Sequence, residues 1–274
     1  MAATPSNPDP PTPAFEMRNV TVTSLRDASV VVLEHVNWTV MPGEYWAIGG
    51  LLRSGKSDLL ALAAGISRPA WGVHHLFGKE LVPGFEQEHL ALRLRIGLVF
   101  DGGQLLHHLT LLENIALPLL YHRGGGAAVS ARVQALLEFT GLEPWADSSP
   151  ATVTRNWQQR IGLARALASG PEVLLLDNPL TGLDPRDAQW WLETLENLAA
   201  GHAITGGRPL TLVVTGDDLR PWHRRARQFA VLKNQQFIPV GARAGLAAHH
   251  EPLLQELLHA QNNSFTTAGA PAES

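Results

Sequence analysis

The chain has 274 residues, enough for one large α/β domain or two small ones, and its 45% of apolar residues permits a sizeable core. Its 25 acidic and 21 basic residues give a formal net charge of −4, which argues against nucleic acid as the main partner because no broad cationic field is available. The lack of cysteine in the sequence excludes disulfides, thiolate zinc sites and cysteine nucleophiles.

The beginning of the sequence predicts a tail. Residues 1–14 are rich in proline and contain neither a basic start nor an apolar segment, so we expect a flexible tail and not a secretion signal. No uncharged apolar stretch approaches the roughly 20 residues of a membrane-spanning helix. Any role at a membrane is therefore expected to depend on a partner.

Apolar residues that recur between Phe15 and Val40 predict an N-terminal antiparallel β layer. A further strand, Tyr45–Ile48, leads into a glycine-rich turn, Gly49–Gly55. The leucines of Lys56–Ala64 then predict a buried helix, which Gly65 ends. Strand, glycine loop and helix together form the context that a phosphate-binding loop requires.

The rest of the chain predicts an α/β core with a helical insert. Strands are expected at His74–Phe77, Ile96–Phe100, Val173–Asp177 and Leu210–Thr215, and helices at Leu111–Leu120, Ser130–Thr140, Trp157–Ala168 and Gly245–Ala260. We therefore expect one domain over residues 15–245, with its helical insert at about 103–158. Residues 246–274 are expected to form a C-terminal helix and tail.

The glycine-rich turn carries the strongest motif. Gly50, Leu51, Leu52, Arg53, Ser54, Gly55, Lys56 and Ser57 match G-x-x-x-x-G-K-[ST]. In this pattern backbone N–H groups surround the β-phosphate, the lysine neutralises it, and the hydroxyl binds Mg²⁺. The alternative is a glycine turn followed by an exposed Lys-Ser pair, but the flanking strand and helix favour the P-loop.

Asp177 is the predicted magnesium carboxylate. It ends an apolar strand, which is where the aspartate of a P-loop nucleotide hydrolase holds the metal directly or through water. Alone this signal is ambiguous, because apolar runs often end in Asp at an ordinary turn.

Several stretches resemble the ATP-binding cassette ATPases. Leu174–Pro185, LLLDNPLTGLDP, resembles the Walker B and D-loop segment of that family. Ile161–Asp177 is similar to the helix after its signature motif, Arg208–Leu219 to its switch-histidine strand, and Leu98–Leu119 to its Q-loop region. The resemblance spans about Phe15–Val240, and the Q-loop stretch is most similar to ATPase subunits of the Mla-type lipid and solvent-tolerance importers.

The resemblance implies a P-loop NTPase fold that binds ATP and Mg²⁺. It also implies a head-to-tail dimer with itself or a related ATPase subunit, in which each nucleotide lies between the P-loop of one subunit and the signature of the other. A separate integral-membrane permease is implied as a partner, and with it a cytoplasmic location on the inner face of the plasma membrane.

Many of the family's motif positions carry other residues in this chain. The catalytic glutamate is replaced by Asn178, the switch histidine by Gly216 and the Q-loop glutamine by Asp101. The signature LSGGQ becomes Val153, Thr154, Arg155, Asn156 and Trp157, in which only Thr154 keeps a hydroxyl. Arg53 stands for the middle glycine of the P-loop, Asp58 for the threonine after Ser57, and no aromatic residue lies near Ser24 and Leu25 to stack on adenine.

The resemblance implies that Gly50–Ser57, Asp58 and Thr154 contact the nucleotide and that Ser57, Asp177 and Asp101 surround Mg²⁺. It also implies that Asn178, Asp101 and Gly216 stand at the family's catalytic positions. Because loss of a positioned base typically costs about 10²- to 10⁴-fold in rate, we expect Mg·ATP to bind and to be hydrolysed slowly or not at all.

Two residues leave alternatives open at this point. Asp101 is either a third oxygen ligand of Mg²⁺ or a substitute base. Arg155 either contacts a γ-phosphate across the dimer or caps a surface loop. Paired histidines at 74/75, 107/108 and 249/250 lack a second set at ligand spacing and are expected at the surface, with His107 and His108 near the permease.

The sequence thus favours the ATP-binding subunit of a transporter that moves lipid or another hydrophobic solute. The alternative is a non-hydrolytic regulatory or scaffold subunit in which ATP holds a dimer together. A family member acting on nucleic acid is disfavoured, because the chain has no zinc module and no basic face.

Overall fold

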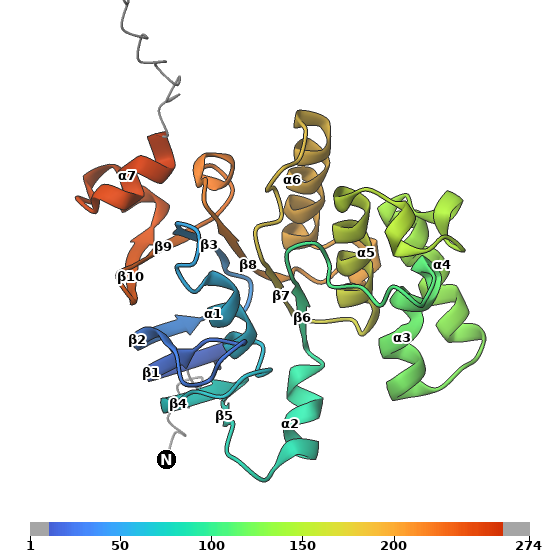
Figure 1. The fold of residues 1–274 in the computed structure, drawn as a ribbon, viewed down its shortest axis with the longest axis horizontal. Coiled ribbons are helices and arrows are strands. Elements are labelled where there is room, and N and C mark those ends of the chain that lie inside the picture. The colour runs from blue at the N-terminus through green and yellow to red at the C-terminus, as the bar shows by residue number, and fades with distance from the viewer. Residues whose placement is uncertain (1–10, 260–274) are drawn as a thin grey trace, which may run out of the picture.

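A computed structural model of the chain describes residues 11–259, so most of the tail expected at 1–14, and the end of the segment expected at 246–274, lie outside the described residues. Ala14, expected in the flexible tail, is instead buried, and its N–H donates to the Val40 carbonyl over 2.8 Å. The described strands are β1 (Phe15–Thr23), β2 (Val31–Val40), β3 (Tyr45–Gly50), β4 (Trp71–Leu76), β5 (Lys79–Glu80), β6 (Ile96–Val99), β7 (Val173–Leu176), β8 (Thr211–Gly216), β9 (Gln228–Lys233) and β10 (Gln236–Ala242). They form one sheet in the order β5-β4-β1-β2-β10-β9-β3-β8-β7-β6 (Figure 1).

One half of the sheet is parallel. Strands β9, β3, β8, β7 and β6 run in the same direction, and every residue of β3, β7 and β8 is buried. These strands read as continuous apolar runs because helices cover both of their faces. The carboxyl ends of parallel strands share one edge of the sheet, and that edge carries the candidate site. The other half, β1, β2, β4 and β5, is the antiparallel layer that the sequence predicts.

The helices are α1 (Lys56–Ala63), α2 (Glu86–Arg93), α3 (Leu111–Arg123), α4 (Ala127–Thr140), α5 (Arg155–Ala168), α6 (Pro185–Ala200) and α7 (Pro252–His259). Figure 1 shows α3, α4 and α5 together as a lobe beside β6. The insert expected at about 103–158 covers α3 and α4 but only the first turn of α5, which continues to Ala168. A capping box between Thr110 and Glu113 starts α3. Within residues 11–259 there is no helix with the length and apolar character needed to cross a membrane.

The structure differs from the sequence prediction in several elements. The sequence analysis does not predict α2, β9 or β10. The expected helix Gly245–Ala260 is instead a 3₁₀ segment, Arg243–Ala248, followed by α7. Proline lacks the N–H that would continue a helix but suits its first turn, so Pro252 begins a separate helix.

His74 corrects the expectation of surface histidines. It lies on β4 facing the core with an exposed fraction of 1%, and burial lowers the pKa of its imidazole to about 3. His107 and His108 are exposed as expected. Among residues 11–259 no group of three possible metal-ligating side chains occurs.

The C-terminal helix α7 packs against the strand that leads to the P-loop. Its buried face includes Leu253, Leu254 and Leu257, and the Leu219 N–H donates to the Leu257 carbonyl over 3.0 Å. A Cβ atom on Gly49 would lie 2.6 Å from Leu257 Cδ1 and 2.8 Å from Leu219 Cδ1. Glycine at this position therefore allows α7 to sit directly on β3.

Candidate nucleotide site

The predicted P-loop connects β3 to α1 at the carboxyl edge of the sheet. Gly55 forms the N-cap of α1 with φ of +90°, a conformation that favours glycine. Gly50 lets the loop fold back closely, because a Cβ there would lie 2.3 Å from Ser54 Oγ and would force that side chain to move. Arg53, in place of a glycine, also has a positive φ, of +65°. The turn projects outward, with Leu52 86% exposed.

Lys56 lies under this loop. Its Nζ donates to the carbonyls of Gly50 and Leu51 over 2.6 and 2.9 Å, and the residue is only 6% exposed. Burial lowers the pKa of the ammonium, while the nearby charges of Asp217 and Asp177 act in the opposite direction. An ammonium has three donors, so one proton remains for a phosphate oxygen.

The metal side of the site is built from β7, β8 and α1. Ser57 Oγ donates to Asp177 Oδ2 over 2.5 Å, and Thr215 Oγ1 donates to Asp177 Oδ1 over 2.9 Å. Asp177 is 3% exposed, and burial is the main cause that raises the pKa of its carboxyl. Asp101 adds to the increase, whereas the two hydroxyl donors and Lys56 oppose it.

These residues fit a magnesium nucleotide. A hydroxyl and a carboxylate in contact are the hard oxygen ligands that Mg²⁺ prefers. Ser54 Oγ is buried and has no hydrogen-bond partner within residues 11–259, so a polar group of the loop is available to a ligand. When bound, Mg²⁺ would neutralise negative charge on the phosphates. Ser57 and Asp177 would hold the metal, and Gly50–Ser57 would hold the phosphates.

The positions expected to act on water are close to this cradle but carry little catalytic chemistry. Asn178 follows Asp177 with φ of +46°, its N–H donates to Thr215 Oγ1 over 3.2 Å, and its buried Oδ1 has no partner in the described chain. Gly216 ends β8 and pairs with Gly49 of β3. An amide and a glycine cannot accept a proton as a carboxylate or an imidazole does.

Asp101 is held by the helical lobe. Arg155 Nη2 donates to Asp101 Oδ1 in an ion pair, and Gln159 Nε2 donates to the same oxygen over 3.4 Å. The guanidinium of Arg155 binds an exposed turn of its own chain, which agrees with the loop-capping alternative, and its contact with a γ-phosphate across the dimer stays a prediction. The role of Asp101 as metal ligand or base stays a prediction.

Two predicted contact residues lie apart from the phosphate cradle. Thr154 is the N-cap of α5 in the lobe, and its side chain makes no capping bond there. Asp58 Oδ1 accepts from the Leu25 N–H over 2.7 Å, which ties α1 to the β1–β2 connection. Nucleotide contacts of Thr154 and Asp58 stay predictions.

Sequence reasoning missed three polar residues at the site. Thr215 orients Asp177, Asp217 acts electrostatically on Lys56, and Gln159 supports Asp101. A hydroxyl at the end of an otherwise apolar strand beside the Asp177 strand is the signal that could have identified Thr215.

A phosphate loop between a buried strand and a helix, with a hydroxyl and a carboxylate at the metal position, defines a P-loop nucleotide-binding protein. Residues 33–181 match the profile of the ABC transporter family, and the chain belongs to that family. Members of this family use ATP with Mg²⁺.

Curated relatives carry transport names. The chain is 38% identical over 173 residues to the methionine import ATP-binding protein MetN 2 of Paraburkholderia xenovorans, covering 63% of this chain and 45% of that protein. It is 32% identical over 229 residues to MetN of Corynebacterium glutamicum (83% and 62%), and 35% identical over 199 residues to the macrolide export protein MacB of Azoarcus sp. (70% and 30%). The chain thus spans less than two thirds of each.

Solved structures agree on the fold. The dimeric ATP-binding cassette MJ0796 bound to ADP and Pi is 28% identical with a TM-score of 0.71, over 81% of this chain and 95% of that one. CbiO1 of Clostridium perfringens, part of the transporter complex cbiONQ, is 22% identical with a TM-score of 0.71, over 87% and 92%, and supports the fold alone.

Proposed function

We propose that residues 15–245 are the nucleotide-binding domain of an ABC transporter ATPase that binds Mg·ATP, hydrolyses it slowly or not at all, and acts on a separate permease. The observation that carries the proposal is the contrast within one site. The Lys56, Ser57 and Asp177 cradle is intact, whereas Asn178 and Gly216 stand where proton-accepting and phosphate-sensing groups are expected. The domain works as a dimer, which the dimeric cassette MJ0796 supports, and it acts on the inner face of the plasma membrane.

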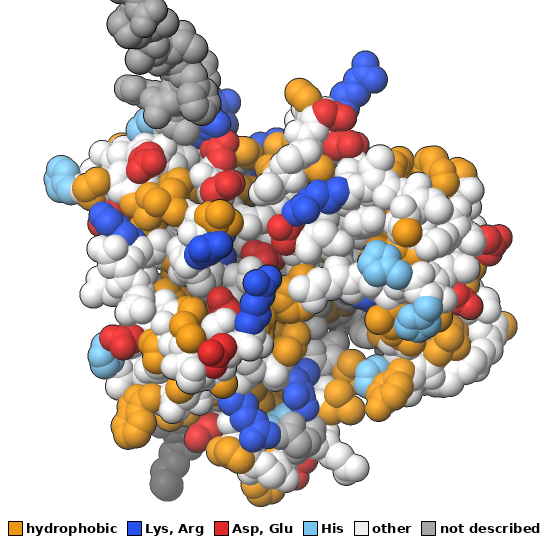
Figure 2. All heavy atoms as spheres, in the orientation of Figure 1, with side chains coloured by type: hydrophobic (Ala, Val, Ile, Leu, Met, Phe, Trp, Pro, Cys, Tyr) orange, Lys and Arg blue, Asp and Glu red, His pale blue; other side chains and the backbone are white. Residues whose placement is uncertain are grey.

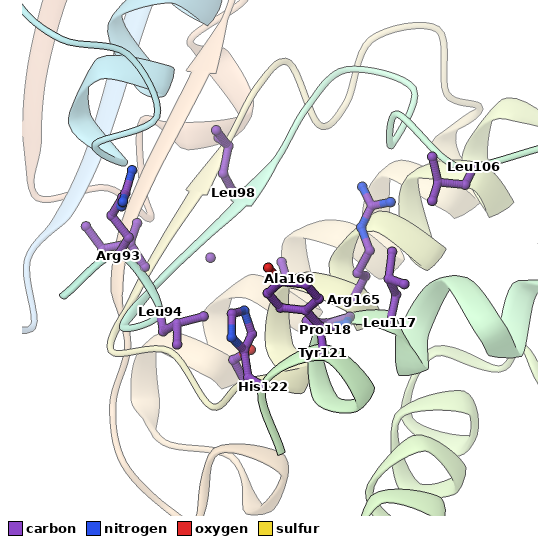
Figure 3. A pocket seen from close by; sticks show the side chains of 13 residues that line it. Arg93, Leu94, Leu98, Leu106, Leu117, Pro118, Tyr121, His122, Arg165 and Ala166 are labelled. Carbon is purple, nitrogen blue, oxygen red and sulfur yellow. The ribbon is translucent and has the colours of Figure 1, made fainter. Parts of the chain in front are cut away.

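A groove between the lobe and the sheet supports contact with a permease. It has a volume of about 520 Å³ and lies between β6, α3 and α5. Figure 3 shows Leu117, Pro118 and Tyr121 of α3 lining it opposite Leu98, with Arg165 of α5 at one side. In Figure 2 the same region is a hollow rimmed by apolar and basic side chains.

The occupant proposed for this groove is a short amphipathic helix of the permease. Tyr121 is 81% exposed although it is a large aromatic, and exposed aromatics beside a hollow are typical of interfaces. Basic groups at Arg93, His122 and Arg165 favour an acidic residue on that helix.

The deciding experiment is a phosphate-release assay on the purified dimer with and without the permease. We expect turnover far below that of an ordinary transporter ATPase in both cases, and nucleotide binding that Lys56→Ala removes. Fast turnover abolished by Lys56→Ala would refute the impaired hydrolysis. Tyr121→Ser should remove any effect of the permease, whereas the matched change of exposed Trp71 to Ser on β4 should not.

The substrate proposed is a lipid or another hydrophobic solute, on the strength of the Q-loop stretch Leu98–Leu119 alone. The names of the relatives support two other candidates, methionine import and macrolide export. Transport of labelled phospholipid, methionine and a macrolide by the reconstituted complex would choose among them. If ATP binding stabilises the dimer while no solute moves, the chain is a regulatory or scaffold subunit. This alternative is supported by Asn178 and Gly216, which replace the catalytic glutamate and the switch histidine.

A further inference from the structure

The loop that follows β6 lies along one face of α5. Arg155 and Gln159 contact the Asp101 carboxylate at the start of the loop. A Cβ on Gly103 would lie 2.3 Å from the Gln158 carbonyl, so the backbones are in direct contact there. Further along the helix, Arg165 Nη2 donates to the Gly103 and Gln104 carbonyls over 2.6 and 3.1 Å. Positions three to four residues apart share a helix face, so these contacts form a continuous row.

The same loop starts beside the metal side of the nucleotide site. β6 and β7 are adjacent parallel strands, with Val99 opposite Leu176. The Asp177 N–H donates to the Val99 carbonyl over 2.8 Å, which leaves Asp101 two residues past that point at the same edge. Burial is the main cause that raises the pKa of the Asp177 carboxyl, and the charge of Asp101 adds to the increase. Asp101 is thus paired with Arg155 of its own chain and follows β6 at the edge of the sheet where Mg²⁺ is expected.

We propose that Arg155 acts as a positioning residue for the metal. By binding Asp101 Oδ1, its guanidinium competes with the divalent cation for that carboxylate. This competition sets how strongly nucleotide binding depends on the cation. This inference rests on the proposed function. The pair can be displaced, because its side chains are 50% and 39% exposed and ion pairs at the surface are weak in water. A hard divalent cation binds a carboxylate oxygen more strongly than a guanidinium in water does.

Arginine is suited to this competition, whereas a neutral side chain is not. The guanidinium keeps its charge at all accessible pH values, so the competition is constant. Gln159 is neutral and binds the same oxygen at the longer distance of 3.4 Å, so it orients the carboxylate without repelling a cation. Removal of the Arg155 charge should therefore free the Asp101 carboxylate for the metal, while Gln159 still orients that carboxylate.

The test measures Mn²⁺ binding by electron paramagnetic resonance in the presence of a non-hydrolysable ATP analogue. The variants are Arg155→Gln, Arg155→Lys, Asp101→Asn and the double variant Asp101→Asn/Arg155→Gln. Arg224→Gln is the matched control, since Arg224 is exposed and lies at the opposite edge of the sheet. Its neighbour Arg227 marks that edge, because the Arg227 N–H donates to the carbonyl of Tyr45, the first residue of β3.

We expect Arg155→Gln to raise the Mn²⁺ affinity about two- to fivefold, the range that corresponds to an exposed ion pair. Arg155→Lys should keep the wild-type value, and the effect of Arg155→Gln should vanish in the Asp101→Asn background. Affinity for the analogue in EDTA should not change, and thermal unfolding of the variants shows that each is folded.

Three results would overturn the inference: no change in Mn²⁺ affinity, a decrease, or an equal increase without Asp101. If Arg155→Gln instead lowers the affinity for the analogue in EDTA, Arg155 binds phosphate directly. Failure of the proposed function looks different, since wild-type protein would then not bind the analogue with Mn²⁺ and Lys56→Ala would change nothing.

Discussion

The carboxyl edge of the parallel strands and the start of α5 have diverged in different ways. At the strand edge, polar groups remain available to a ligand: Ser54 Oγ has no partner in the described chain, and Lys56 keeps one proton free. At the start of α5, the replaced signature residues are engaged inside the chain. Arg155 binds Asp101, Asn156 Oδ1 accepts from Trp191 Nε1 over 3.1 Å, and Trp157 packs on Trp145 with ring centroids 4.5 Å apart.

This difference shows what each region can still do. The strand edge has kept the groups that recognise a phosphate, whereas the start of α5 has become part of the internal packing of the lobe. A ligand can therefore be held by the first region without help from the second. Four changes test that division, beginning with the largest expected effect.

Lys56→Ala should weaken binding of ATP about 10- to 100-fold, because a hydrogen bond to a charged group contributes roughly 1.5–3 kcal/mol. Isothermal titration with Mg·ATP measures the change. Lys79→Ala on β5 is the matched control, since Lys79 is an exposed lysine of the antiparallel layer. Equal affinities for wild type and Lys56→Ala would show that the proposed phosphate cradle does not bind ATP.

Asp177→Asn should reduce the affinity for Mn²⁺ at least roughly tenfold, the loss seen when even a supporting group of a metal site is removed. The same change should stabilise the nucleotide-free protein at neutral pH, because it removes a buried charge. The folded pKa of Asp177 lies above the unfolded value of 3.8, so wild type gains stability as the pH falls through the folded value toward 3.8.

Urea unfolding of both proteins across this pH range measures that difference: the increment on acidification belongs to wild type and is absent from Asp177→Asn. If the variant is less stable than wild type at neutral pH, Asp177 supports the fold and the assigned cost of its burial is wrong.

Gly103→Ala should destabilise the protein by about 1–3 kcal/mol more than Gly102→Ala, the range for overpacking in a filled space. Both glycines have φ near +70°, at 75° and 70°, so both alanines meet the same backbone strain. Only at Gly103 does the added Cβ meet the Gln158 carbonyl, whereas the space around Gly102 is open. Equal urea midpoints for the two variants would show that the loop is not seated on α5.

Asn178→Glu should raise phosphate release less than tenfold, well short of the roughly 10²- to 10⁴-fold that a positioned base supplies. Asn tolerates the observed φ of +46°, whereas glutamate does not adopt it readily, and Gly216 still offers no imidazole. The double change Asn178→Glu/Gly216→His should exceed the sum of the single changes. Asn178→Gln controls for side-chain length, and a 100-fold rise from Asn178→Glu alone would show that only the base was missing.

The regular parts of the molecule could be predicted from the sequence. Val173–Leu176 and Tyr45–Gly50 are continuous apolar runs, and buried parallel strands have that pattern. The P-loop follows from its glycines, since Gly50 and Gly55 have no room or no permitted backbone for a side chain.

Other features depend on contacts that no local pattern contains. The Asp101–Arg155 pair joins positions 54 residues apart, so neither the spacing nor the residue types reveal it. His74 is hidden because alternation along β4 places it toward the core, whereas a polar histidine was expected outside. The strand β10 was missed because its exposed and half-buried residues give no clear period.

The contact of Leu257 with Gly49 makes the end of the described chain a steric part of the strand that feeds the P-loop. A side chain at position 49 would require Leu257 and Leu219 to move. We therefore expect position 49 and the packing of α7 to vary jointly among homologous chains. For the protein engineer, shortening the chain before Pro252 would open space beneath the P-loop, so truncation at this end is not neutral for nucleotide binding.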